Sequence, residues 1–184
     1  TPSRASFLTG CYPQRVGMGE IPPIPNGKPW MTRVLYPGAP YGLGPNEITI
    51  ADVLKKAGYD TAYIGKWHLG DIKPFMPMDH GFESYFGILY TPDMTPVNFV
   101  QGYKVVEHNI NLDEVTDRYT SMSKKFIDDN KDHPFFLFLS HMVPHAPVHA
   151  APRFHGKSPG GIYGDTIEQL DGSTGQILDE RKKD

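Results

Sequence analysis

The chain has 184 residues, a length typical of about one domain. Its 18 basic and 21 acidic residues give a formal net charge of −3, which argues against nucleic acid or an anionic membrane as the partner. Hydrophobic residues make up 39% of the chain, and no apolar run is long enough to predict a transmembrane segment. With 19 glycines and 18 prolines, we expect a folded chain in which shaped loops take up much of the length. A single cysteine, Cys11, excludes an internal disulfide.

The first segments of the chain predict a short helix followed by a long loop. Residues 3–9 favour a helix, and Gly10 is a plausible left-handed cap at its end. Residues 20–45 contain seven prolines and four glycines, a density that excludes a regular helix or a central strand. We interpret this stretch either as a packed loop that faces a substrate or as a structural wrap. Its aromatic residues are Trp30, Tyr36 and Tyr41.

A second helix is predicted after Thr49. Thr49 and Asp52 have the spacing of a capping box in which Asp replaces the usual Glu. Gly58 would end this helix. The apolar residues that share one of its faces are Ile50, Val53, Leu54 and Ala57.

The rest of the chain alternates between strand and helix patterns. Residues 61–64 form a short β-prone run, and residues 113–128 predict a helix with a buried stripe. Residues 134–140 are apolar without alternation, which indicates a strand buried on both faces of a sheet. A last helix is expected from about residue 164. The two apolar stripes are Val115, Tyr119, Met122 and Phe126, and Ile167, Leu170, Ile177 and Leu178. This order is typical of the α/β class.

Ligands of α/β sheets bind at the carboxyl ends of the strands, where this chain places Lys66 and His68. Residues two apart on an extended segment point the same way, so an ammonium and an imidazole would converge on one spot and suit an anion. The alternative is a solvated lysine beside a hydrogen-bonded core histidine. Arg4, near the start of the first helix, would also favour an anion there, although a lone arginine is usually solvated.

The second strand end is followed by three histidines spaced four apart, His141, His145 and His149. This spacing places zinc ligands on one face of a helix. Pro144 and Pro147 exclude that helix, and no glutamate stands where a zinc protease needs one. We therefore expect a loop with one functional histidine, or a packed aromatic corner.

Together these segments resemble the sulfatase family. Residues 1–10 resemble the signature Cys/Ser-x-Pro-Ser-Arg-x-x-x-Leu-Thr-Gly, entered one residue late. Residues 58–68 resemble the second sulfatase signature, with its Gly-Lys-Trp-His intact. Residues 140–147 are similar to the histidine loop of the family, and residues 79–82 to its intervening turn. Order and separation match over nearly the whole chain, most closely with the branch of arylsulfatase A and N-acetylgalactosamine-6-sulfatase.

The resemblance implies a three-layer αβα fold with a mostly parallel or mixed sheet, as in alkaline phosphatase. It implies that residues 1–184 are part of a single N-terminal catalytic domain, truncated at both ends. It also implies hydrolysis of a small-molecule or glycan sulfate ester by a formylglycine nucleophile and Ca²⁺. The formylglycine would stand immediately before Thr1, and the calcium ligands would lie outside the chain, so no metal ligand is assigned. A formylglycine-generating enzyme would act during maturation, in a protein that is secreted, periplasmic or lysosomal.

Five residues take roles from the resemblance alone. Arg4 would hold the formylglycine, and Lys66 would contact the sulfate and the ester oxygen. His68 would hydrogen-bond the nucleophile and act as a base when sulfate leaves. His145 would contact the sulfate and assist the leaving group, and Thr91 would lie near the sulfate.

Two other functions remain open at this point. A phosphonate or phosphate monoester hydrolase of the same superfamily would use a similar cationic site. A non-catalytic relative that binds sulfated glycans would lack the nucleophile. We expect residues 1–184 alone to show no turnover, because the nucleophile and the calcium ligands lie outside them.

Overall fold

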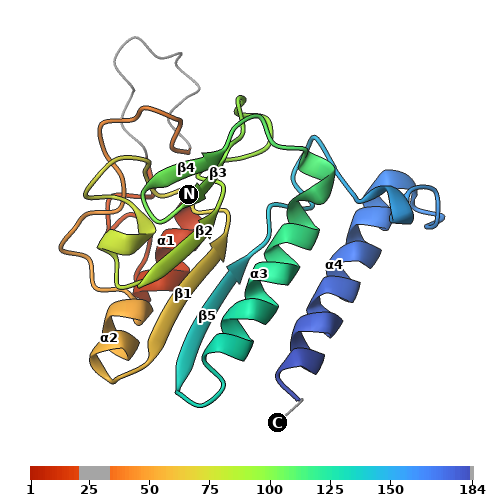
Figure 1. The fold of residues 1–184 in the computed structure, drawn as a ribbon. Coiled ribbons are helices and arrows are strands. Elements are labelled where there is room, and N and C mark those ends of the chain that lie inside the picture. Colours follow the sequence, from red (N-terminus) through yellow and green to blue (C-terminus); the bar gives the residue numbers. More distant parts are fainter. Residues whose placement is uncertain (21–33, 183–184) are drawn as a thin grey trace.

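The computed structural model describes residues 1–20 and 34–182. These form a mixed five-stranded sheet with helices on both faces (Figure 1). The strands are β1 Asp60–Gly65, β2 Ser84–Gly87, β3 Phe99–Gln101, β4 Lys104–Glu107 and β5 Phe135–Ser140. The α-helices are α1 Pro2–Thr9, α2 Ile50–Lys56, α3 Val115–Asp129 and α4 Gly161–Glu180, and short 3₁₀ turns cover Pro77–Asp79, Leu112–Glu114 and Pro152–Phe154. None of the described helices is long and apolar enough to cross a membrane.

The sheet has the order β4-β3-β2-β1-β5. Strand β1 runs parallel to both of its neighbours, β2 and β5, whereas β2, β3 and β4 pair in antiparallel fashion. The carboxyl ends of the three parallel strands therefore meet at one edge. The start of α1 lies at that same edge, where the label N stands in Figure 1.

Two hydrophobic cores, one on each face of the sheet, confirm the predicted αβα layering. Side chains alternate along the strands, so Tyr63 and Phe138 belong to one core while Ile64 and Leu139 belong to the other. The first core is covered by α1 and α2, and the second by α3. Helix α4 packs beside α3 rather than on the sheet (Figure 1).

The predicted ends of the first two helices are confirmed. Helix α1 ends at Gly10, which takes a left-handed φ of 68°. The capping box before α2 is complete, because the amide of Asp52 donates to Thr49 Oγ1 at 3.2 Å and the amide of Thr49 donates to Asp52 Oδ2 at 2.9 Å. Aspartate therefore makes the reciprocal bond that is more often made by glutamate.

The predicted buried face of α2 is wrong. Ile50 and Val53 are 40% and 55% exposed, and the fully buried residue of this helix is Ala51. The turn at Gly81 packs so closely on the α2 backbone that a Cβ there would overlap the amide of Asp52. A small residue is needed at such a contact, so the helix turns alanine inward and leaves larger apolar side chains outside.

Helix α3 confirms its predicted stripe, but α4 does not. Helix α4 begins at Gly161, and its Ile167 and Leu178 are exposed. Its buried side toward α3 is polar instead. The hydroxyls of Ser173 and Thr120 lie 2.6 Å apart, within hydrogen-bond distance. Because buried polar groups need hydrogen-bond partners, these contacts decide which face of α4 is buried, against the apolar pattern of the sequence.

The run 134–140 does form a strand, with side chains in both cores, but every residue of β5 is only half-buried. The reason is that β5 pairs with β1 alone in the described sheet and forms its edge. In the predicted loop 20–45, residues 34–45 contain no helix or strand, and residues 21–33 with Trp30 lie outside the described residues. Strands β2, β3 and β4 were not predicted.

The sheet edge that carries the parallel strand ends depends on close backbone contact at Gly87. A Cβ at this position would overlap the carbonyl oxygen of Gly65 on β1. We predict that Gly87→Ala lowers the free energy of unfolding of the full-length protein by about 1–3 kcal/mol, measured by urea denaturation.

The matched control is Gly172→Ala in α4, where nothing lies within 4 Å of the added Cβ. Because alanine favours a helix over glycine, this variant should be unchanged or more stable by up to about 1 kcal/mol. Equal stability of the two variants would contradict the steric account.

Candidate active site

The segment that follows β1 carries Lys66, Trp67 and His68 across the carboxyl edge of the sheet. The amide of Lys66 donates to the carbonyl of Ser140 on β5 at 2.8 Å, and the amide of His68 donates to the carbonyl of Leu89 at 2.8 Å. The Trp67 side chain is fully buried in the core beneath α1. Backbone bonds to both neighbouring segments therefore fix the positions of Lys66 and His68.

Arg4 joins α1 to the ends of β1 and β5. Its Nε donates to the carbonyl of Lys66 at 2.9 Å, and its Nη2 donates to Ser140 Oγ at 2.9 Å. The hydroxyl of Tyr63 donates to the same Lys66 carbonyl at 2.6 Å. Ser140 and Tyr63 were not predicted as site residues. A polar residue that closes an apolar strand at its carboxyl end was the available signal for Ser140.

Lys66 is a buried cation, with only 6% of its surface exposed. Burial disfavours its ammonium and lowers its pKa to about 8; the charge of Arg4 acts in the same direction, whereas Asp93 opposes it. In the part of the chain that the structure describes, Lys66 forms no ion pair with a carboxylate. A cation buried in this way is suited to bind an anion.

His68 is buried beside Lys66 and holds the loop that precedes α2. Its Nε2 lies 2.9 Å from the carbonyl of Leu35; a carbonyl accepts, so Nε2 carries the proton and Nδ1 has a free lone pair. Burial lowers the pKa of His68 well below its usual value, and the positive charges of Lys66 and Arg4 act in the same direction. The ring is therefore neutral at neutral pH, and its backbone takes an unusual positive φ of 62°.

The main-chain nitrogen of Thr1 lies in the same cluster. Thr1 is buried, and its nitrogen lies close enough to Arg4 and Lys66 to feel their charges. The Thr1 hydroxyl accepts from the amide of Leu35 at 2.9 Å. Leu35 therefore contacts both Thr1 and His68, which places the loop 34–45 against the cluster.

Among the described residues, Thr91 and His145 form no hydrogen bond with Arg4, Lys66 or His68. Thr91 is buried, and its hydroxyl has no hydrogen-bond partner among the described residues. His145 is exposed, and its Nδ1 is 3.9 Å from Asp93 Oδ1. Asp93 also acts on the charge of Lys66, so it lies near both the lysine and the histidine. The structure thus brings Arg4, Lys66 and His68 together directly, and His145 is linked to them through Asp93.

The other histidine that was considered for the site, His141, faces the core. Its ring packs 6.0 Å from that of Tyr119 on α3, and burial lowers its pKa to about 4. Among the described residues, His141 forms no hydrogen bond with Arg4, Lys66 or His68. The choice of His145 over His141 as the site residue stays a prediction that this geometry favours.

Comparison with known proteins identifies the family. A family model described as Sulfatase matches residues 1–184. The chain belongs to the sulfatase family. Human N-acetylgalactosamine-6-sulfatase is 33% identical over 97% of this chain, and human steryl-sulfatase is 29% identical over the same share. The chain spans only 37% and 42% of the lengths of these two sulfatases.

A solved structure extends the likeness to the fold. A Bacteroides thetaiotaomicron protein, solved in work on the metabolism of multiple glycosaminoglycans, superimposes with a TM-score of 0.82 at 27% identity. The match covers 98% of this chain and 48% of that protein. The predicted resemblance to sulfatases and the α/β sulfatase fold are therefore confirmed.

The described part of this sulfatase offers no ready calcium site. Across residues 1–20 and 34–182, no group of three or more His, Cys, Asp or Glu side chains is placed to hold a metal ion. Calcium needs several oxygen ligands, whereas the cluster presents the nitrogen cations of Arg4 and Lys66. The described residues do not fit Ca²⁺ by themselves.

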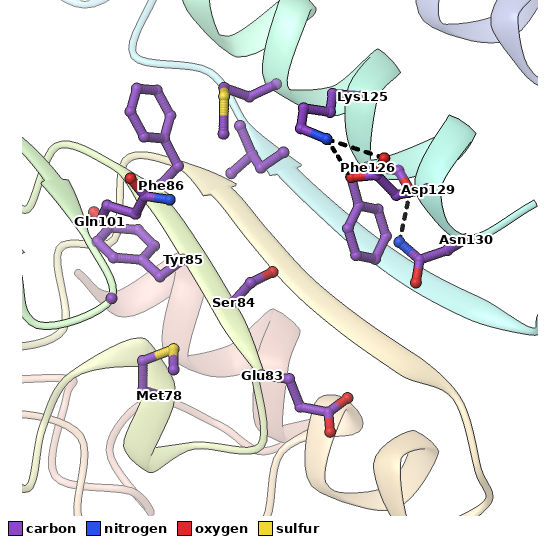
Figure 2. Close-up of a pocket in the computed structure, with 13 residues that line it drawn as sticks. Met78, Glu83, Ser84, Tyr85, Phe86, Gln101, Lys125, Phe126, Asp129 and Asn130 are labelled. Carbon is purple, nitrogen blue, oxygen red and sulfur yellow. Dashed lines mark hydrogen bonds and ion pairs between the residues drawn. The ribbon is translucent and has the colours of Figure 1, made fainter.

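A pocket of about 530 Å³ lies elsewhere on the sulfatase, between β2 and the last turns of α3 (Figure 2). Glu83 and Ser84 line it at the start of β2, and Lys125 pairs with Asp129 at its rim. It therefore opens toward the amino end of β2, and none of the predicted site residues line it. Ligands of α/β sheets bind at the carboxyl ends of the strands, so the volume of this pocket does not make it the active site.

The pKa of Lys66 makes a prediction for the binding of inorganic sulfate to the full-length protein. Below about pH 8 the lysine is charged, and sulfate affinity should be constant; as the pH rises further, the affinity should fall about tenfold per pH unit. Isothermal titration between about pH 7 and about pH 9.5 measures this dependence. Lys66→Met should bind sulfate weakly at every pH. An unchanged affinity across the range, or the same fall in the variant, would contradict the assignment to Lys66.

Proposed function

We propose that the full-length protein that contains this chain is a sulfuric ester hydrolase acting on the sulfate ester of a sugar or a phenol. The observation that carries the proposal is the buried Lys66 ammonium, held beside Arg4 and His68 at the carboxyl edge of a sulfatase fold. The names of similar proteins favour sugar sulfates, since they include an N-acetylgalactosamine-6-sulfatase and a protein of glycosaminoglycan metabolism.

In this proposal Lys66 binds the sulfate group and its ester oxygen. Sulfuryl transfer depends mainly on position and on stabilising charge in the transition state. A lysine that is already desolvated, and whose backbone is fixed to β5, offers a preorganised charge for this purpose. The unpaired hydroxyl of Thr91 provides a further donor to a sulfate oxygen.

The nucleophile in this proposal is a formylglycine joined to the nitrogen of Thr1, made from Cys or Ser by a formylglycine-generating enzyme. Its hydrated aldehyde supplies the hydroxyl that attacks sulfur. The burial of the Thr1 nitrogen beside Arg4, Lys66 and His68 supports this position. Arg4 positions the start of α1, and the free Nδ1 of His68 accepts a hydrogen bond or a proton from the nucleophile side.

His145 assists the leaving group in this proposal by donating a proton to the ester oxygen. It is the exposed histidine of the loop after β5, and so it is open to substrate as His141 is not. An imidazolium is a suitable general acid near neutral pH.

We infer that residues 1–184 are part of one larger catalytic domain and that Ca²⁺ is held by residues outside them. The share of the relatives that the chain covers supports this inference, as do the exposed apolar residues of α2 and α4. No role in catalysis is assigned to the metal from the described residues.

The proposal is tested with 4-nitrophenyl sulfate and the full-length protein. Lys66→Met and His68→Ala should each lower kcat/KM by about 100-fold or more, because each removes a group that contacts the reacting atoms. Lys56→Met, which removes an exposed lysine of α2, is the matched control and should keep the activity.

Near-normal turnover by Lys66→Met or His68→Ala would contradict these roles. Faster turnover of 4-nitrophenyl phosphate than of the sulfate by the wild-type protein would instead identify a phosphate monoester hydrolase. Binding of a sulfated glycan without turnover of either ester would indicate a non-catalytic relative.

A further inference from the structure

Asp93 is a carboxylate at a site that otherwise gathers positive charge. It lies in the loop after β2, two residues beyond Thr91, and its side chain is 52% exposed. Its Oδ1 is 3.9 Å from His145 Nδ1, and its charge favours the ammonium of Lys66. A carboxylate beside a sulfate site repels the substrate. Asp93 is therefore expected to interact favourably with another residue of the site.

That residue is His145, and one hydrogen bond defines the orientation of its ring. Its Nδ1 is 2.5 Å from the carbonyl oxygen of Ala146, and since a carbonyl accepts, Nδ1 carries a proton. The Nδ1–H edge therefore faces the Ala146 carbonyl with Asp93 close by. Nε2 makes no hydrogen bond with a described residue and remains available to a substrate.

The same loop contains a closed pair of the same kind for comparison. His149 Nδ1 lies 2.8 Å from Asp113 Oδ1, within hydrogen-bond distance. The His145–Asp93 separation is longer by about one ångström, and both side chains are well exposed, so Asp93 acts on this ring through its charge.

We propose that Asp93 is a positioning residue for His145: its carboxylate lies on the Nδ1 side of the ring, and its charge stabilises the imidazolium that protonates the leaving group. This inference rests on the proposed sulfatase activity and adds a residue to it. Among the described residues, Asp93 is the charged group that contacts the ring, and its charge also acts on Lys66.

The transfer needs no reactant beyond the nucleophile and solvent. The bond between sulfur and the ester oxygen breaks as the sulfuryl group passes to the nucleophile, whose hydroxyl proton moves to Nδ1 of His68. The proton on His145 Nε2 moves to the ester oxygen, which leaves as an alcohol. The imidazole is then neutral, and it is protonated again from solvent.

The dependence on the leaving group tests this role in the full-length protein. A hexose 6-sulfate releases an alcohol that needs the proton, whereas 4-nitrophenyl sulfate releases a stable phenolate that does not. We expect Asp93→Asn to lower kcat/KM about tenfold or more for the sugar sulfate and no more than about twofold for the aryl sulfate.

Two further variants keep the test specific. Asp93→Glu keeps the charge and should restore most of the activity on the sugar sulfate. Asp113→Asn removes the carboxylate of the other Asp–His pair in this region and should leave the ratio of the two activities unchanged.

An equal loss on both substrates, or a change in KM alone, would make Asp93 a substrate contact and overturn the proposal. Unchanged activity of Asp93→Asn on both substrates would also overturn it. If the wild-type protein hydrolyses neither ester, the proposed function itself fails, which is a different result from the failure of Asp93 alone.

Discussion

The anchoring of Arg4 determines how the site is assembled. Its guanidinium donates to the Lys66 carbonyl and to the Ser140 hydroxyl, so one side chain joins α1 to the ends of β1 and β5. These three segments are distant in sequence, and no backbone bond joins the start of α1 to either strand end. The Thr1 nitrogen, Lys66 and Ser140 consequently share one small region, and the positive charge of Arg4 remains close enough to lower the pKa of Lys66.

Close packing of backbone makes the same region rigid. Cβ atoms at Gly65 and Gly87 would overlap the carbonyls of Ser140 and Gly65, so the ends of β5, β1 and β2 approach more closely than side chains would permit. Tyr63 adds a hydrogen bond to the Lys66 carbonyl from within the core. A preorganised charge of this kind is what sulfuryl transfer requires, because little reorganisation is left for the reaction itself.

The sequence predicted the elements whose patterns are long or have clear ends. Helices α1 and α3 and strands β1 and β5 were found because caps, stripes and apolar runs are local properties. Strands β2, β3 and β4 have only three or four residues, too few for a reliable period. The buried faces of α2 and α4 were assigned wrongly because contacts with Gly81 and with the polar side of α3 decide them, and these are tertiary.

For the site, Lys66, His68, Arg4, Thr91 and His145 came from motifs, whereas the partners that hold them did not. The contact of Ser140 with Arg4 depends on a strand register, and that of Asp93 with His145 on a loop path, and no local pattern reports either contact. We expect sulfate to bind at Lys66, next to the residue that is joined to the nitrogen of Thr1. A crystal structure of the full-length protein with inorganic sulfate tests it most directly. A sulfate oxygen should lie within hydrogen-bond distance of Lys66 Nζ and beside the residue that precedes Thr1. A sulfate bound elsewhere, with Lys66 turned away from it, would contradict the assignment of Lys66 as the sulfate-binding residue.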